Sequence, residues 1–192
     1  MTMTKKKETR TVDITNIQTR NTDNEPIKIS GYAAVFNSRT SIGDFFDEMI
    51  APGAFDKSIA SDDIRALYNH NWDKVLGRTK ANTLTLREDD KGLFFEIELP
   101  NTSYARDLAE SMERGDIDQC SFGFLVKDGK ERWDYSQEPA LRTLEEVELY
   151  EVTICSLPAY EDTEAALVRS KEIDQTVERR IKLIKQINEV LK

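Results

Sequence analysis

The feature that most constrains the fold is a series of short β-rich runs, several of which alternate apolar and polar residues. Between residue 8 and about residue 160, five such runs are predicted as strands. They cover residues 27–36, 83–88, 92–99, 119–126 and 147–155. The second and third runs flank Asp89-Asp90-Lys91-Gly92, a composition typical of a hairpin turn. We therefore expect an antiparallel sheet.

Two helices are expected between these strands. The first begins at Pro52 and runs to about Ala60, because proline is well tolerated in the first helical turn. The second covers residues 103–113 and stops at Gly115. Neither supplies the regular alternation of strand and helix that a parallel sheet requires. The expected class is α+β, a closed or nearly closed and mostly antiparallel β-barrel with flanking helices.

The chain of 192 residues suits one domain with a tail. Residues 1–160 are predicted to form that domain, and the polar stretch 161–172 a linker. Residues 173–192 are predicted to form an amphipathic C-terminal helix, which either docks on its own domain or makes a coiled-coil or capsid-directed contact. Its apolar positions recur at steps of three and four, at Val177, Ile181, Ile184, Ile187 and Leu191.

Charge and composition exclude several classes of function. Acidic residues outnumber basic ones by 36 to 27, the net charge is −9 and no long basic run occurs, which argues against binding nucleic acid. The apolar stretches are too short to span a membrane, and the first residues do not read as a secretory signal, so a cytoplasmic protein is expected. Two cysteines, Cys120 and Cys155, make neither a disulfide framework nor a zinc site, and no cofactor or metal is expected.

The chain contains a single histidine, His70, so any mechanism that needs an imidazole must use it. His70 ends a predicted strand, residues 64–70, at the polar corner 69–73. A histidine in such a place is commonly a loop residue with a local hydrogen bond. The alternative is a general base.

The run 119–126 holds a serine suited to nucleophilic attack. As a strand, it places Cys120, Phe122 and Phe124 on one apolar face, and Ser121 and Gly123 on the other. A glycine beside the serine leaves room for a peptide to approach. The alternative is a strand with a bulge at Gly123 and a serine that faces solvent.

Glu151 lies in the middle of a largely apolar strand, 147–155, where strict alternation places it with Val147 and Leu149. A buried carboxylate is costly unless a donor or cation meets it. Its partner is either an arginine such as Arg142, in a structural ion pair, or an imidazole N–H.

Ser121, His70 and Glu151 together supply the nucleophile, base and orienting acid of a catalytic triad. Two competing assignments are weaker. Cys120 points to the apolar face, where a thiol is usually inert, and Asp73 is too close along the chain to approach the ring of His70 well. The sequence has no Gly-x-Ser-x-Gly elbow, Walker loop or His-Glu-x-x-His motif.

Several separated motifs in order resemble the prohead proteases of tailed bacteriophages, the capsid-maturation serine proteases that are similar in fold to the herpesvirus assemblins. The resemblance covers about residues 8–168. The motifs are Gly31-Tyr-Ala-Ala-Val-Phe, Ile50-Ala-Pro-Gly-Ala-Phe, Leu67-Tyr-Asn-His, Cys120-Ser-Phe-Gly-Phe, Leu149-Tyr-Glu-Val-Thr and Leu157-Pro-Ala-Tyr.

The resemblance implies a serine endopeptidase that acts inside the procapsid of the host cell. It would cleave the scaffolding portion of the major capsid protein, and itself, during capsid maturation. The family's catalytic histidine, serine and acid fall on His70, Ser121 and Glu151. The herpesvirus relatives use a second histidine as the third member, which this chain lacks. Arg78 is a weak candidate for a substrate or oxyanion contact.

A rival interpretation is a catalytically silent assembly module. It would bind capsid or scaffold chains through a sheet edge and the C-terminal helix, and self-association is compatible with either interpretation.

Overall fold

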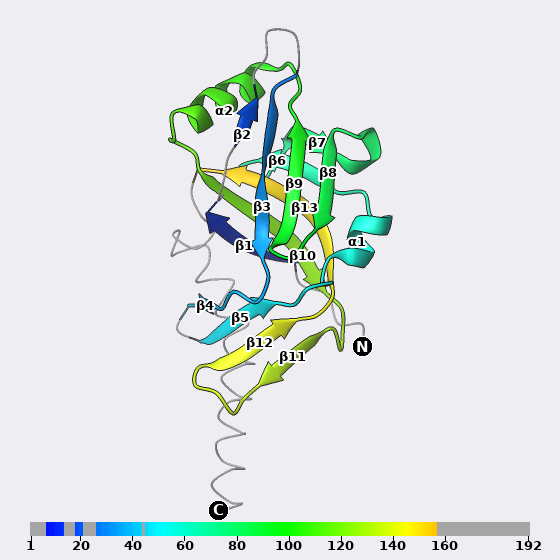
Figure 1. Ribbon diagram of the computed structural model, residues 1–192, viewed down its shortest axis with the longest axis vertical. Helices are drawn as coiled ribbons and strands as arrows, with labels where there is room; N and C mark the ends of the chain where they lie inside the picture. Colours follow the sequence, from blue (N-terminus) through cyan, green and yellow to red (C-terminus); the bar gives the residue numbers. More distant parts are fainter. Residues whose placement is uncertain (1–6, 14–17, 21–25, 44, 157–192) are drawn as a thin grey trace, which may run out of the picture. The chain divides into compact units, whose positions relative to one another are not determined.

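The computed structural model describes residues 7–13, 18–20, 26–43 and 45–156. The predicted linker 161–172 and helix 173–192 lie outside these residues. Figure 1 shows that the described part is mostly β-structure with two short helices. No helix among the described residues is long and apolar enough to cross a membrane.

The strands form three sheets. The largest, sheet A, contains in spatial order Lys7–Asp13 (β1), Gln119–Val126 (β10), Val147–Cys155 (β13), Arg65–Tyr68 (β6) and Asn71–Arg78 (β7). Sheet B contains Gln18–Arg20 (β2), Lys28–Val35 (β3), Gly92–Glu98 (β9) and Leu84–Glu88 (β8). Sheet C contains Glu131–Asp134 (β11), Ala140–Leu144 (β12), Phe46–Ile50 (β5) and Thr40–Ile42 (β4). The helices are Asp56–Ser61 (α1), Ser103–Glu113 (α2) and a 3-10 turn, Thr79–Ala81 (η1).

The predicted closed barrel is wrong for the described residues. Closure requires the two outer strands of a sheet to pair with each other. In sheet A the outer strands are β1 and β7, at opposite ends of the strand order, and sheets B and C are separate. Two pairings, β13 with β6 and β12 with β5, are parallel, whereas the other pairings are antiparallel. The mostly antiparallel sheets and the two helices are otherwise confirmed, in a fold that is mostly β.

The five predicted runs are present as β3, β8, β9, β10 and β13, and the strand predicted over 64–70 is present as β6. The β8–β9 hairpin is also confirmed, because the Asp89 carboxylate accepts hydrogen bonds from the amides of Lys91 and Gly92 at 2.9 and 3.2 Å. Helix α2 has the predicted bounds. Helix α1 begins later than Pro52, because the Glu88 carboxylate holds residues 52–55 in a turn by accepting from the amides of Gly53 and Phe55 at 2.7 and 2.6 Å.

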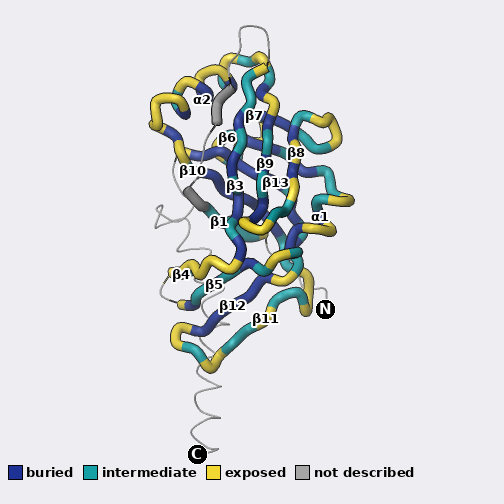
Figure 2. The backbone as a smooth tube through the Cα atoms, in the orientation of Figure 1, coloured by how far each residue is buried: buried dark blue, intermediate teal, exposed yellow. Residues whose placement is uncertain are grey.

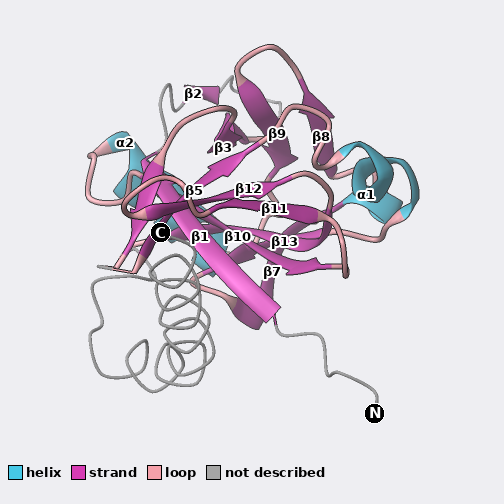
Figure 3. Cartoon of the chain, turned by 90° about the horizontal axis from the view of Figure 1, so that it is seen from below, coloured by secondary structure: helices cyan, strands magenta, loops and turns pink. Residues whose placement is uncertain are grey.

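The main core lies between sheets A and B. Strand β3 contacts β10, and β7 contacts β9, so the two sheets face each other, and the tube in Figure 2 is darkest where their strands cross. Both sheets and helix α2 contribute fully buried side chains, among them Phe122, Phe95 and Leu108. The view from below in Figure 3 places helices α1 and α2 at opposite sides of the sheets. One face of β10 and β13 thus packs in the core, and the candidate active site lies on the other face.

Candidate active site

Strand β10 places Ser121 on the face of sheet A that points away from the core. Cys120, Phe122 and Phe124 on the other face are fully buried in the hydrophobic core, as the alternation predicted. Ser121 itself is 0% exposed, so the alternative of a serine that faces solvent is wrong. The pairing of β10 with β13 does shift between Gly123 and Phe124, but the extra residue of this bulge lies in β13 and not at Gly123 as the alternative expected.

That bulge corrects the predicted face of Glu151. Gly123 pairs with Glu151 and Phe124 with Leu149, so Tyr150 is the extra residue of β13. An extra residue reverses the alternation beyond it. Glu151 therefore lies on the face of Ser121, whereas Val147 and Leu149, its predicted neighbours, pack in the core.

The buried Glu151 carboxylate has two partners, and Arg142 is neither of them. Its Oε1 lies 2.8 Å from Nδ1 of His70, and its Oε2 accepts a hydrogen bond from the Thr153 hydroxyl at 3.2 Å. Because the unprotonated carboxylate only accepts, it sets Nδ1 of His70 as a donor and leaves Nε2 to accept a proton. Of the two partners predicted for Glu151, the structure has the imidazole.

The strand predicted over 64–70 ends at Tyr68, so His70 lies in the tight hairpin between β6 and β7. Asn69 and His70 are its two central residues, with φ of 50° and 54°. Positive φ at both central residues is the type I′ geometry that matches the twist of a hairpin. The Asn69 amide donates to the Ile154 carbonyl at 2.9 Å, and its side-chain oxygen accepts from the Ser156 amide at 3.1 Å, which fixes the turn against β13.

Ser121 and Glu151 thus lie on neighbouring strands of one sheet, and His70 lies in the turn that follows the next strand, β6. Ser121 pairs with Thr153 across β10 and β13, and Thr153 pairs with Leu67 of β6, three residues before His70. His70 and Glu151 are hydrogen-bonded. Ser121 instead donates from Oγ to the backbone carbonyl of Arg10 in β1 at 2.9 Å, and no hydrogen bond joins it to His70 in the described part of the chain.

The other three candidates, Cys120, Asp73 and Arg78, lie in surroundings that do not suit a catalytic role. Burial holds the pKa of the Cys120 thiol well above its usual value, as expected of an inert thiol. Asp73 is exposed and does not contact His70. Arg78 is occupied by Asp63, to whose carboxylate its Nε donates at 2.8 Å.

Cys155 is a second buried thiol on the face of Glu151. Burial, followed by the nearby carboxylate charge, raises the pKa of Cys155 to about 11. No group of histidine, cysteine and acidic side chains suited to a metal ion occurs among the described residues.

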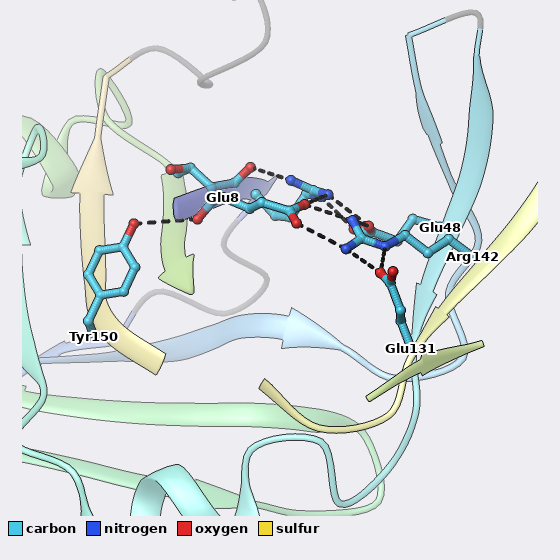
Figure 4. A network of polar contacts seen from close by, with 7 residues as sticks. Glu8, Glu48, Glu131, Arg142 and Tyr150 are labelled. Atoms are coloured by element: carbon cyan, nitrogen blue, oxygen red, sulfur yellow. Dashed lines mark hydrogen bonds and ion pairs between the residues drawn. The ribbon is translucent and has the colours of Figure 1, made fainter. Parts of the chain in front are cut away.

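Sequence analysis missed a buried charge cluster that ties β1 to sheet C, and Figure 4 shows it. Arg142 donates to Glu8 at 2.7 and 2.9 Å, to Glu48 at 3.0 Å and to Glu131 at 2.6 Å. Arg10 donates to Glu48 at 2.5 and 2.7 Å. The sequence offers no signal for this cluster, because its members are far apart in the chain and none of their four strands, β1, β5, β11 and β12, was predicted.

Burial raises the pKa of Glu8, but the hydrogen bonds and charges of Arg142 and Arg10 outweigh burial and hold the pKa of Glu8 below its usual value. For Arg142, burial lowers the pKa, and the surrounding carboxylates raise it by more. Both groups are therefore charged at neutral pH.

Comparison with known proteins gives two matches. A family model described as Caudovirus prohead serine protease matches residues 15–179, most of the chain. The solved structure of the bacteriophage T4 capsid assembly protease, gp21, matches with a TM-score of 0.51 at 10% identity, over 79% of this chain and 98% of that one. At this identity the structural match establishes a similar fold only. No curated protein sequence matches.

Proposed function

The chain belongs to the Caudovirus prohead serine protease family, and on that premise we propose that it is a serine endopeptidase with Ser121, His70 and Glu151 as its triad. The observation that carries the proposal is the 2.8 Å contact between the only histidine and a buried carboxylate, on the face of the sheet that also carries Ser121. The proposed substrates are the scaffolding portion of the major capsid protein and the chain itself, inside the procapsid.

In the proposed reaction, Ser121 Oγ attacks the carbonyl carbon of a peptide bond while Nε2 of His70 takes the serine proton. His70 then gives this proton to the leaving amine as the peptide C–N bond breaks. Water hydrolyses the acyl-enzyme in the second half of the reaction. Glu151 orients the ring through Nδ1 and stabilises the imidazolium, and Thr153 positions the carboxylate.

The test is an intact-mass time course of the purified protein at high concentration, repeated with the cognate capsid protein. Ser121→Ala removes the proposed nucleophile, and Ser41→Ala, an exposed serine of β4, is the matched control. We expect discrete fragments from the wild type and from Ser41→Ala, and none from Ser121→Ala. Cleavage by folded Ser121→Ala would show that another group is the nucleophile.

A second candidate is the catalytically silent assembly module. One observation favours it, because Ser121 is fully buried and bonded to β1 in the described structure. No cleavage by any variant, even with capsid protein present, together with stable capsid binding, would support this alternative.

A further inference from the structure

The nucleophile proposed above is hydrogen-bonded to the edge strand beside it. Strand β1 pairs antiparallel with β10, and the register sets Thr11 opposite Ser121 and Thr9 opposite Gly123. The Ser121 hydroxyl donates to the Arg10 carbonyl, which belongs to the Arg10–Thr11 peptide bond. Because Ser121 is 0% exposed, no external peptide reaches it while β1 stays in place.

The described side chains of β1, those of residues 7–11, contribute little to the core. Residues 7–11 are Lys, Glu, Thr, Arg and Thr, none is fully buried, and the apolar core cluster begins at Ile29 among the described residues. The strand is held by backbone pairing with β10 and by charged side chains. A strand bound in this way is separable from the core, unlike β10 or β13.

Alternate side chains of β1 contact two different surfaces. Glu8 and Arg10 point to sheet C, where Arg142 and Glu48 bind them in bidentate pairs. Arg142 also donates to Glu48 at 3.0 Å, so these two charged side chains remain paired with each other when β1 leaves.

Lys7, on the other face, has its ammonium 4.6 Å from the ring centre of Tyr150 and 5.9 Å from that of Trp72. These two rings are stacked 6.4 Å apart, and Trp72 is 49% exposed. A cation over stacked aromatic faces is a favourable contact.

We propose that β1 occupies the substrate site, which is the β10 edge. A substrate would bind as an extended strand in place of β1, with Arg142 selecting an acidic residue at the Glu8 position, Glu48 a basic residue at the Arg10 position, and the Tyr150–Trp72 pair a cation at the Lys7 position. Pairing of a peptide with an exposed strand supplies affinity, and contacts to alternate side chains supply specificity. The inference depends on the proposed function only in calling the bound strand a substrate.

The test loosens β1 in the full chain by swapping its charges with Glu8→Arg/Arg10→Glu, which leaves the net charge unchanged. The matched control is Lys28→Glu/Glu96→Lys, which swaps an exposed ion pair in sheet B. If the first variant does not fold, the uncharged Glu8→Gln/Arg10→Gln replaces it. Amide hydrogen exchange of residues 119–126 reports opening of the edge, and a fluorophosphonate, which loses fluoride when a serine oxygen attacks its phosphorus, reports access to Ser121.

In the charge-swapped chain each exchanged side chain faces a like charge in sheet C. We therefore expect the hydrogen-exchange rate of residues 119–126 and the rate of the fluorophosphonate reaction to rise at least about tenfold. Both rates should stay unchanged in the control. A labelled peptide, Lys-Glu-Thr-Arg-Thr-Val-Asp, should bind the charge-swapped chain and slow the fluorophosphonate reaction. The same peptide with its Glu and Arg exchanged should bind at least about tenfold more weakly.

Two results would overturn the inference: an opened β10 edge with no gain in access to Ser121, or peptide binding that ignores the charge order. Failure of the proposed function looks different. In that case no variant reacts with the fluorophosphonate, while hydrogen exchange and peptide binding still report whether the β10 edge takes a second strand.

Discussion

At the residue scale, the proposed mechanism depends on one imidazole and the carboxylate that orients it. Glu151 is buried, and its two oxygens are shared between His70 and Thr153. This arrangement leaves Nε2 of His70 as the group that can take a proton from Ser121.

We predict that Glu151→Gln leaves a reduced but measurable rate of peptide cleavage. The amide oxygen can still accept from Nδ1 of His70, but the negative charge that stabilises the imidazolium is lost. The expected fall in kcat/KM is of the order of 10²–10⁴-fold. Steady-state kinetics on a peptide substrate measure it, with circular dichroism as a check on folding. An unchanged kcat/KM would show that Glu151 has no part in the reaction.

Gly123 is the position where a single added methyl group disturbs the site most directly. A Cβ there would lie 2.6 Å from the Tyr150 ring and 2.8 Å from Cγ of Glu151, both closer than van der Waals contact. Gly123→Ala should therefore cost about 1–3 kcal/mol of unfolding free energy and displace Glu151, with a loss of cleavage. Urea unfolding measures the first effect. Gly129→Ala is the control. Its added Cβ would meet no neighbouring atom, but the φ of 73° strains any residue other than glycine, so this variant shows the cost of backbone strain without crowding.

At the element scale, the attachment of β1 depends on a carboxylate whose pKa is lowered in the folded chain. Glu8 has an ordinary pKa of 4.5, and Arg142 and Arg10 hold it lower in the structure. A lowered folded-state pKa contributes stability that is present above pH 4.5 and is lost as the pH falls below it toward the folded value.

We predict that Glu8→Gln flattens this acid dependence. The wild-type unfolding free energy should fall between neutral pH and about pH 3 more steeply than that of Glu8→Gln, because the amide has no proton to gain. Urea unfolding at several pH values tests this. The control Glu96→Gln, in an exposed ion pair, should keep the wild-type slope. Equal slopes for wild type and Glu8→Gln would mean that Glu8 does not stabilise the fold through its charge.

At the scale of the whole molecule, Arg142 joins sheet C to β1 of sheet A. Its guanidinium is nearly buried and contacts three carboxylates, those of Glu8, Glu48 and Glu131. Removal of one member of such a cluster leaves buried charges of one sign without compensation.

We predict that Arg142→Leu destabilises the protein by about 3–5 kcal/mol. Arg132→Leu, which removes an exposed pair with Glu145 just after β12, should cost no more than about 1 kcal/mol. Denaturant unfolding of both variants gives the comparison. Similar costs for the two would show that the cluster around Arg142 contributes no more than a surface ion pair.

The sequence by itself indicated several strands of the core and the proposed site residues. Period-two patterns located β10 and β13, because these strands bury one full face of apolar side chains. A single histidine and a carboxylate in an apolar strand singled out His70 and Glu151. Polar edge strands such as β1 and β4 bury no such face, so no periodicity marked them.

Only the tertiary structure decided how these elements meet. The bulge at Tyr150 put Glu151 on the face of Ser121, and a bulge depends on strand pairing, which local sequence does not encode. Sheet pairing likewise left the barrel open and placed β1 beside Ser121 at the edge of sheet A. Arg142 pairs with three other carboxylates and not with Glu151. A buried charge is stabilised by the opposite charges that the fold places beside it, and these contacts are made between residues far apart in the chain.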